Sequence, residues 1–326
     1  MGKTLLLLYK ALPKNGQNLH FSPIFAANQN RLYILLSASI CIMEERKEEW
    51  DIEIQPKSGL FEINFKDLWH YRDLLFLLVK RDYIASFKQT VLGPIWFFIQ
   101  PILTTLVYIL VFGNIAQLGT DGMPKAAFYL SGVIMWNYFS TCINSTSTTF
   151  VTNANIFGKV YFPRLIMPIS IVISNLLKFL VQFAFFLAIL IYYLIKGDTA
   201  IVVSWYVLLT PILVLIMATL GLSIGLIISS MTTKYRDLVH LIAFGVQLMM
   251  YATPVVYSSS IVQGKLHTLL MINPMTGLIE GFRFAFLGSG SFSFGMLAYS
   301  LIFSIVLLFI GILTFNKVEK SFMDTV

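Results

Sequence analysis

The 326-residue chain is dominated by hydrophobic residues, which make up 57% of it, whereas charged residues make up only 12%. A soluble domain carries about 25% charged residues, and a water-soluble fold of this size needs more polar surface than this chain supplies. The composition therefore argues against soluble enzymes, disordered proteins and nucleic-acid binders, although 23 Lys and Arg outnumber 16 Asp and Glu. An integral membrane protein is expected.

The N-terminal region does not fit that description. Residues 1–42 contain an uncharged run at 32–43 that is too short to cross a bilayer. No small-residue cleavage site follows it, so it is a weak signal peptide. We interpret residues 1–42 as a non-native or disordered leader that precedes a true start at Met43, and residues 43–63 as a charge-rich cytoplasmic segment.

Residues 64–88 are predicted to form an amphipathic helix. Phe65, Leu68, Trp69 and Leu75 recur near helical spacing, and charged residues lie between them. Such a helix is expected to lie in the cytoplasmic membrane interface, with its basic residues near anionic headgroups. It is either a plain anchor or a docking element for a soluble partner.

Long stretches without Asp, Glu, Lys or Arg mark the membrane spans. A span needs about 20 apolar residues, and it must be helical because lipid supplies no partners for the backbone. The runs do not alternate as the strands of an outer-membrane barrel do. We predict an all-α integral membrane protein whose permease domain, residues 89–320, has six transmembrane helices, at 94–115, 126–149, 168–195, 203–230, 238–257 and 296–316.

Basic residues near the span ends predict the orientation, because cytoplasmic loops are enriched in Lys and Arg. If the segment before the first span is cytoplasmic, most basic residues near the span ends lie inside. Those outside are then Lys125, Lys196, Lys265 and Arg283. Both termini are therefore predicted to be cytoplasmic.

The chemistry of the spans points away from catalysis. They contain no Asp or Glu, whereas ion-driven carriers usually place ionisable residues at membrane depth. A sodium site built from backbone carbonyls stays open. The histidines lie in separate segments, and Cys41 and Cys142 have neither metal nor disulfide spacing. We expect no catalytic residue, and no metal or cofactor bound by this chain.

Polar residues nevertheless form stripes on the predicted helices. Asn137, Thr141 and Asn144 share one helix face, as do Asn175, Lys178 and Gln182. The stripes either make hydrogen bonds between helices or line a hydrophilic path, and we favour the path.

Other span residues point to packing or to contact with a ligand. Gly221, Gly225 and Ser229 follow each other at steps of four and so share one helix face, which predicts close packing of this helix against a neighbour. The aromatic residues Tyr108 and Trp136 suit either an interfacial belt or contact with sugar rings along a channel.

The outer segment 258–295 is too apolar for a solvated loop and too short to cross the membrane twice. Asn273 and Pro274 split it into two short helical pieces, at about 264–272 and 275–287, and Glu280 and Arg283 are spaced to pair. A re-entrant hairpin protected by protein is expected. We interpret it as a gate, with a structural plug as the alternative.

Two short cytoplasmic connections mix charge, aromatic residues and helix formers. They lie within residues 153–168 and 231–240. They either serve only to keep these basic loops on the cytoplasmic side, or form protruding docking sites for a motor protein.

Several motifs in order carry a family resemblance. They are the runs Leu77–Asp82, Phe87–Trp96, Gln100–Pro101, Lys159–Arg164, Tyr235–Asp237, Thr253–Val255 and Asn273–Met275. Together they resemble the polysaccharide-export permeases of ATP-binding-cassette transporters, which export lipopolysaccharide O-antigen or teichoic acid. The resemblance covers about residues 60–320, whereas the leader before Met43 departs from the family.

The resemblance implies a permease subunit that exports a lipid-linked polysaccharide (O-antigen, teichoic acid or a capsule-like polymer) across the bacterial plasma, or inner, membrane. It implies a homodimer with two copies of a separate ATPase subunit, which bind ATP and Mg²⁺. The outer hairpin would supply the gate helices. An ATP-independent secondary carrier or flippase is the alternative. The coupling residues implied are Arg72, Lys80, Arg81, Lys159, Phe162, Arg164, Tyr235, Arg236 and Asp237.

Overall fold

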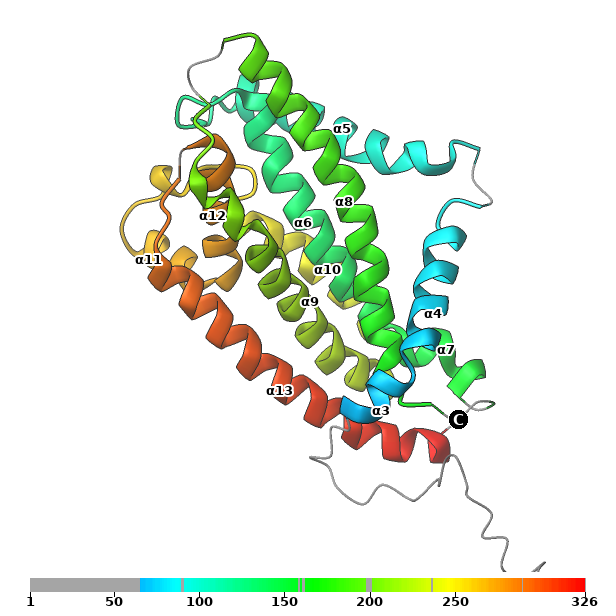
Figure 1. Ribbon diagram of the computed structural model, residues 1–326. Coiled ribbons are helices and arrows are strands. Elements are labelled where there is room, and N and C mark those ends of the chain that lie inside the picture. Colours follow the sequence, from blue (N-terminus) through cyan, green and yellow to red (C-terminus); the bar gives the residue numbers. More distant parts are fainter. Residues whose placement is uncertain are drawn as a thin grey trace, which may run out of the picture. The chain divides into compact units, whose positions relative to one another are not determined.

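The computed structural model describes residues 65–88, 91–157, 159, 162–197, 201–235, 237–288 and 290–325, without the side chains of 65–67 and 320–325. These residues form helices and no strands (Figure 1). The predicted leader at 1–42 and the segment 43–63 lie outside the described residues. The all-α class is confirmed for the part of the chain that is described.

Four helical segments among the described residues are long and apolar enough to cross a membrane. They are Gly93–Ile115 (α5 with its short flanking helices), Ile166–Ile195 (α8), Trp205–Thr232 (α9 and the turn before it) and Phe294–Glu319 of α13 (Phe294–Thr325). The predicted spans at 126–149 and 238–257 correspond to α6 (Lys125–Ser147), rich in Ser, Thr and Asn, and to α10 (Leu238–Tyr251), which has only 14 residues. Four of the six predicted spans are therefore supported by length and composition, and the spans at α6 and α10 stay predictions.

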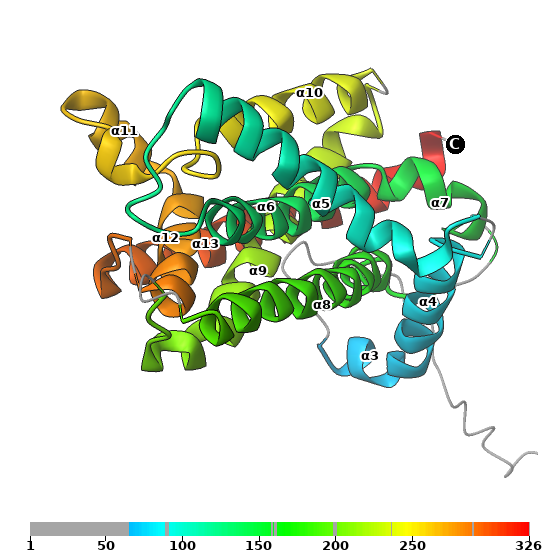
Figure 2. The ribbon, with the colours of Figure 1, turned by 90° about the horizontal axis from the view of Figure 1, so that it is seen from above.

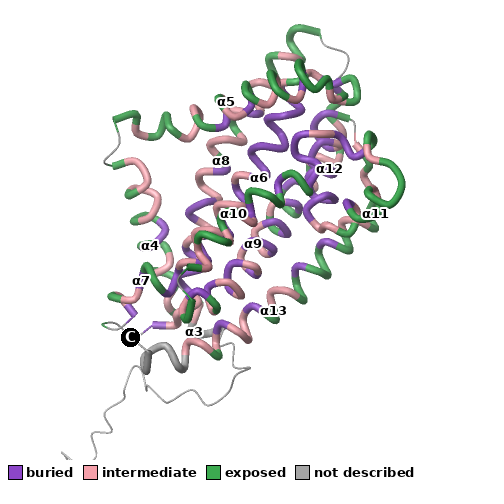
Figure 3. Tube along the Cα trace, turned by 180° about the vertical axis from the view of Figure 1, so that it is seen from behind, coloured by how far each residue is buried: buried purple, intermediate pink, exposed green. Residues whose placement is uncertain are grey.

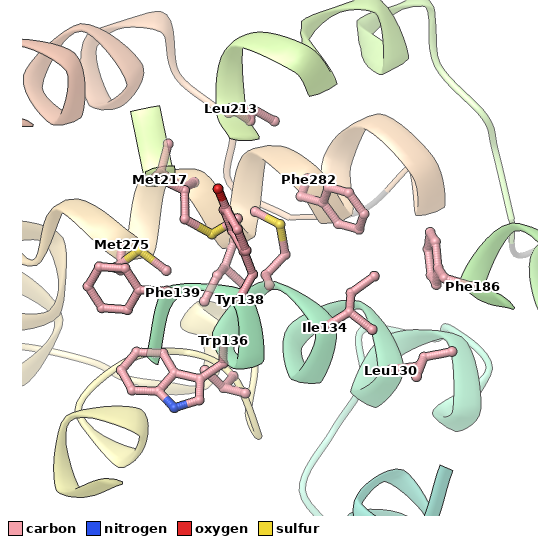
Figure 4. Close-up of a cluster of buried hydrophobic side chains, with 14 of the residues drawn as sticks. Leu130, Ile134, Trp136, Tyr138, Phe139, Phe186, Leu213, Met217, Met275 and Phe282 are labelled. Carbon is pink, nitrogen blue, oxygen red and sulfur yellow. The ribbon is translucent and has the colours of Figure 1, made fainter. Parts of the chain in front are cut away.

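Helix α6 is the centre of the bundle. It packs against α8 and α9, and most of its residues are buried (Figure 3). Large apolar side chains gather around it and pack closely, as side chains in protein interiors do. The cluster in Figure 4 joins Leu130, Ile134, Trp136, Tyr138 and Phe139 of α6 to Phe186, Leu213, Met217, Met275 and Phe282.

Small residues let α9 (Thr210–Thr232) approach its neighbours closely. A Cβ atom on Gly225 would lie 2.5 Å from Cβ of Thr146 in α6, and one on Gly311 in α13 would lie 2.9 Å from the Ser223 carbonyl oxygen. The Thr232 hydroxyl donates to the Ser147 carbonyl oxygen at 2.7 Å. Small residues of this kind are what helix packing in membranes uses. The close packing predicted for Gly221 and Gly225 is confirmed.

At the end of the bundle that the sequence analysis predicts to be outer, called the outer end below, α11 (Lys265–Ile272) and α12 (Pro274–Leu287) have nearly the predicted bounds. Asn273 lies between them and caps α12, because its side-chain oxygen accepts the backbone N–H of Met275 at 3.0 Å. The two helices differ in burial: α12 is almost wholly buried, whereas α11 is largely exposed (Figure 3). Their placement relative to a membrane stays a prediction.

At the opposite end, the single helix predicted over 64–88 is divided in two. It forms α3 (Phe65–His70) and α4 (Arg72–Ala85), because Tyr71 leaves helical geometry with ψ at 19°. Leu78 and Val79 are the buried residues of α4. The helix packs along α8, where the Ser174 hydroxyl donates to the Val79 carbonyl oxygen at 3.4 Å. The position of α3 and α4 at the membrane interface stays a prediction.

Helix α5 (Trp96–Tyr108) makes less contact with the bundle. It extends between the outer part of α6 and α4 (Figures 1 and 2), and only 11% of the most apolar stretch of Gly93–Ile115 is buried. Leu103, Leu106 and Leu110 are each 55% exposed. An apolar helix exposed in this way is expected to contact lipid or another protein chain.

The close approach of α6 and α9 makes Gly225 sensitive to substitution. Gly225→Ala places a methyl group against Thr146, and overpacking of this kind costs about 1–3 kcal/mol. We expect a lower melting temperature of the purified protein in detergent, measured by fluorescence-detected size exclusion after heating.

The matched control is Gly245→Ala in α10, where a Cβ atom would meet nothing within 4 Å. Alanine favours a helix over glycine by about 1 kcal/mol, so this variant is expected to keep or raise the melting temperature. Equal melting temperatures for the two variants would contradict the close contact of α6 with α9.

Candidate transport path and coupling surface

The polar stripe predicted on α6 is the part of that helix left accessible. Asn137, Thr141 and Asn144 are partly exposed, on a helix whose other faces are mostly buried. Ser140 and Ser145, which the sequence analysis did not single out, are also partly exposed. The face therefore consists of amide and hydroxyl groups, which donate and accept hydrogen bonds without carrying charge.

The stripe predicted on α8 is only partly open. Lys178 and Gln182 are partly exposed, but Asn175 is 4% exposed and lies in the core of the protein. The Lys178 ammonium group donates to the Asn175 side-chain oxygen at 3.2 Å. The Asp82 carboxylate of α4 also attracts Lys178 electrostatically. The hydrogen-bond partner of this lysine is therefore a neutral amide, whereas the Asp82 carboxylate forms its ion pair with Arg81 at 2.8 Å.

Both predicted lining aromatics pack against other side chains, Trp136 buried and Tyr108 partly exposed. The Tyr108 hydroxyl lies 3.3 Å from the Met250 sulfur of α10, and the ring contacts Tyr129 edge-on at a centroid distance of 6.5 Å. Trp136 is 4% exposed and contacts Phe139 at 5.4 Å. Both rings stabilise the bundle in this structure, and their contact with a glycan stays a prediction.

The outer end contains a buried ion pair. The Arg283 guanidinium and the Glu280 carboxylate are 3.7 Å apart, and both side chains are 1% exposed. Arg283 also donates to the Pro254 carbonyl oxygen at 2.6 Å and to that of Val255 at 2.7 Å. The predicted pairing is confirmed. Arg283 of α12 therefore holds the connection that follows α10 against α12.

The neighbourhood of Arg283 is shaped to hold it. Its guanidinium carbon lies 3.8 Å from the centroid of the Phe128 ring, a cation–π contact from α6. A Cβ atom on Gly132 would lie 2.6 Å from the Val255 carbonyl oxygen and 2.9 Å from Nη2 of Arg283. Glycine at position 132 therefore provides the space that the arginine occupies.

The hinge residues Asn273 and Pro274 are also held in place. The Asn273 amide donates to the Thr253 hydroxyl at 2.9 Å, and the Ser300 hydroxyl of α13 donates to the Pro274 carbonyl oxygen at 2.7 Å. The structure thus brings all four predicted gate residues to one end of the molecule. Whether this end opens stays a prediction.

The sequence analysis missed a serine cluster at this end. The hydroxyls of Ser258 and Ser260 both donate to the Asp121 carboxylate, the second at 2.8 Å. These bonds tie the connection before α6 to that after α10. The run of three serines at 258–260 is the signal that would have pointed to it.

Most predicted coupling residues are exposed on connections and helices at the opposite end. Tyr235 is 54% exposed, and the Lys234 ammonium group lies 5.3 Å from the centroid of its ring. Arg236 lies outside the described residues. The other exposed members are Arg72, Lys80, Arg81, Lys159 and Asp237.

Phe162 and Arg164 point inward instead. Phe162 is 6% exposed and contacts Phe157 at 5.8 Å. The Arg164 guanidinium donates to the Glu319 backbone oxygen at 2.7 Å and lies 3.9 Å from its carboxylate. Burial lowers the pKa of Arg164, and the Glu319 charge opposes that shift. These two residues hold the connection against the bundle, and their role in coupling to an ATPase stays a prediction.

A cluster of aromatic and aliphatic side chains that the sequence analysis did not identify lies at the opposite end, which is predicted to be cytoplasmic and is called the inner end below. The Phe150 ring of α7 (Thr149–Phe157) stacks on Phe315 of α13 at 4.5 Å. Leu78 of α4, Met167 of α8 and Leu226 of α9 belong to the same cluster. Residues so far apart in the sequence meet only through the fold, so sequence spacing carried no signal of the cluster.

A helical membrane protein with a polar helix face and a basic, aromatic end has the features of a permease. The description "ABC-2 type transporter" belongs to the family model that matches residues 73–287. That segment runs from α4 to the end of α12, about two thirds of the chain. The chain belongs to this family of membrane permeases.

Several curated proteins are similar to the chain. The O-antigen export system permease protein RfbA of Myxococcus xanthus is 31% identical over 223 residues, covering 68% of this chain and 83% of the relative. A Klebsiella pneumoniae protein of the same name is 26% identical, covering 79% and 96%. The polysialic acid transport protein KpsM of Escherichia coli is 23% identical, covering 78% and 95%.

The buried pair at the outer end predicts that Arg283 is essential to the fold there. Arg283→Met leaves the Glu280 carboxylate buried without its partner, which costs about 3–5 kcal/mol. We expect a clearly lower melting temperature and less protein in the membrane fraction.

The double variant Glu280→Met with Arg283→Met removes both charges and is expected to recover part of the loss. Arg72→Met, at an exposed position on α4, serves as the control and should behave as the unmodified protein. A normal melting temperature for Arg283→Met alone would contradict the buried pair.

Proposed function

We propose that this chain is the transmembrane permease subunit of an ATP-driven exporter. Its cargo is a lipid-linked polysaccharide (an O-antigen, a teichoic acid or a capsule-like polymer) that moves from the cytoplasm across the bacterial plasma membrane. The observation that carries the proposal is the extent of the family match: residues 73–287 include both the accessible polar face of α6 and most of the exposed coupling residues. The named functions of RfbA and KpsM support the same class of cargo.

The proposed subunit crosses the membrane six times, with α6 and α10 added to the four apolar segments, and both termini are cytoplasmic. Helices α3 and α4 lie at the cytoplasmic interface, and α11 with α12 forms the outer re-entrant hairpin. Two copies associate. The exposed apolar surface of Gly93–Ile115 supports this, because Leu103, Leu106 and Leu110 are each 55% exposed within this chain.

Energy enters through a separate ATPase, two copies of which bind ATP and Mg²⁺. Their proposed docking surface is the inner end, where Lys159, Tyr235 and Asp237 are exposed. ATP binding favours one conformation of the permease only if the ATPase binds that conformation more tightly. Arg164 transmits the movement, because its bond to Glu319 joins the connection at 157–165 to α13.

The path for the polymer follows the accessible face of α6. Asn137, Thr141 and Asn144 supply amide and hydroxyl groups for sugar hydroxyls. An ion-driven carrier is disfavoured, since ABC-2 transporters take their energy from an ATPase and the predicted spans contain no Asp or Glu.

Co-purification with an ATPase subunit tests the proposal directly. The tagged chain is expressed from its own gene neighbourhood, solubilised in mild detergent and isolated. We expect an ATPase in equal amount, and loss of cell-surface polysaccharide when the gene is deleted. Isolation of the chain without an ATPase, together with normal surface polysaccharide in the deletion strain, would overturn the proposal.

The exposed inner residues predict a charge-sensitive docking surface. Lys159→Glu reverses a charge at that end, and we expect at least a tenfold loss of export, since unfavourable charge contacts at an interface cost several kcal/mol. The measurement is surface polysaccharide together with the amount of ATPase retained on purification.

The control is Lys196→Glu, which reverses an exposed lysine after the end of α8, at the other end of that helix. It is expected to leave ATPase retention unchanged. Equal loss of the ATPase in both variants would contradict a docking surface at the inner end.

A further inference from the structure

We infer that Asp121 is a releasable latch at the outer end of the molecule. Its carboxylate holds the α5–α6 connection (residues 116–124) against the serine segment (residues 258–260), and release of these bonds frees the connection to move during each transport cycle. This inference rests on the proposed function, because the movement serves export. It adds to that function a contact that must break before the outer end opens.

The latch joins two connections that are far apart in the sequence. The Ser258 and Ser260 hydroxyls donate to the two oxygens of the Asp121 carboxylate, the second at 2.8 Å. The two serine hydroxyls also lie 2.9 Å from each other. Hydrogen bonds to an ionised carboxylate are stronger than those between neutral groups. One side chain of the α5–α6 connection therefore holds the serine segment at two points.

The latch is open to water on one side. Asp121 and Ser260 are exposed, whereas Ser258 is 1% exposed. Water can replace a hydroxyl as the partner of an exposed carboxylate, so the net free energy of these bonds is small and they can break and form again. A contact with this property suits a part of the protein that moves.

The chain just before the serine segment is held to α12 by buried bonds. Arg283 of α12 donates to the carbonyl oxygens of Pro254 and Val255 at 2.6 and 2.7 Å, and the side chains of Arg283 and Val255 are buried. Breaking such bonds leaves buried polar groups unsatisfied, which is costly. When the two connections separate, the serine segment therefore stays with α12, and the α5–α6 connection is the part that moves.

The backbone of the α5–α6 connection is irregular. It follows a stretch of π-helix at Ile109–Ile115, a geometry that is frequent at functional sites. Gln117 and Asp121 each have a φ of 51°, in the left-handed region that few residues other than glycine adopt. Strained backbone persists only while its surroundings hold it. The latch is one such contact, and the bond from the Lys125 ammonium group to the Gly113 carbonyl oxygen at 2.9 Å is another.

The helix that leads into this connection is weakly held. Only 11% of the most apolar stretch of Gly93–Ile115 is buried. At the outer end of α5, the Tyr108 hydroxyl lies 3.3 Å from the Met250 sulfur, which is a weak acceptor. An element with few buried contacts is displaced at low cost. Release of the latch therefore lets the outer end of α5 move together with the α5–α6 connection.

A reversible cross-link tests whether the latch must release. Asp121→Cys and Ser260→Cys are combined, Cys41 is replaced by serine, and a short bis-thiosulfonate reagent joins the two thiols in spheroplasts that contain the chain and its ATPase. We expect export of surface polymer to fall in proportion to the cross-linked fraction, and to recover when a reductant cleaves the link. Unchanged export by the cross-linked form would overturn the inference while leaving the export function intact.

The matched control links the serine segment to the bundle itself. The Ser259 and Ser291 hydroxyls lie 3.3 Å apart, and the Ser291 backbone N–H donates to the buried Glu280 carboxylate at 3.2 Å. Ser259→Cys with Ser291→Cys, once cross-linked, is expected to export normally, because both residues stay with α12. An equal loss of export in the control pair and the latch pair would also overturn the inference.

A labelling experiment tests the latch without a cross-link. Met123, in the α5–α6 connection, is 5% exposed, and Met123→Cys is labelled with a maleimide in the purified complex of the chain and its ATPase. Adding Asp121→Ala is expected to speed labelling about fivefold, as the loss of such bonds implies. Thr120→Ala removes a bond within the connection, from the Thr120 hydroxyl to the Met123 carbonyl oxygen at 2.8 Å, and should leave the rate unchanged.

Equal labelling rates with and without Asp121→Ala would overturn the inference even if neither cysteine pair accumulates in the membrane. Absence of surface polymer, with the unmodified chain and its ATPase at normal levels in the membrane, would instead overturn the proposed function. The labelling rates are measured on the purified complex, so they separate a failure of the latch from a failure of export.

Discussion

The close packing of α9 against α6 and α13 is the contact on which the rest of the structure depends. Lipid gives helices no hydrophobic reason to associate, so they hold together through small residues and short contacts. Gly225 meets Thr146, and Gly311 meets the Ser223 carbonyl oxygen, at distances that no larger residue permits. With α8 on its other side, α6 is buried except along its polar face. The same packing thus stabilises the bundle and leaves one hydrophilic surface.

Both ends of this bundle are held by interactions that reach α13. At the outer end, the Tyr299 hydroxyl donates to the Ile272 carbonyl oxygen at 2.8 Å, next to the hinge of the outer hairpin. At the inner end, Phe315 stacks on Phe150, and Glu319 accepts from Arg164. One continuous helix therefore contacts both the hinge between α11 and α12 and the connection that precedes α8.

Local signals predicted the helices well and the direction of side chains less well. The break at Asn273–Pro274 was evident, since proline starts a helix readily and asparagine caps it. The polar stripe of α6 was visible from its spacing. Arg164 was predicted to be a coupling residue from the family resemblance, and the structure shows that it donates to a backbone acceptor on α13. Trp136 was expected on a channel, yet the packing of α6 buries it. Arg164 bonds to Glu319, and Trp136 is covered by helices packed around α6, so both outcomes depend on residues far away in the sequence.

The sequence by itself determined that this is a helical membrane protein, because runs of uncharged residues have no stable place in water and only helices satisfy their backbone in lipid. It also showed that the predicted spans contain no Asp or Glu. The tertiary structure alone decided which polar residues are accessible and which charges form buried ion pairs, as Glu280 and Arg283 do. Periodicity shows which residues share a helix face, but only the packing of neighbouring helices decides whether that face is covered.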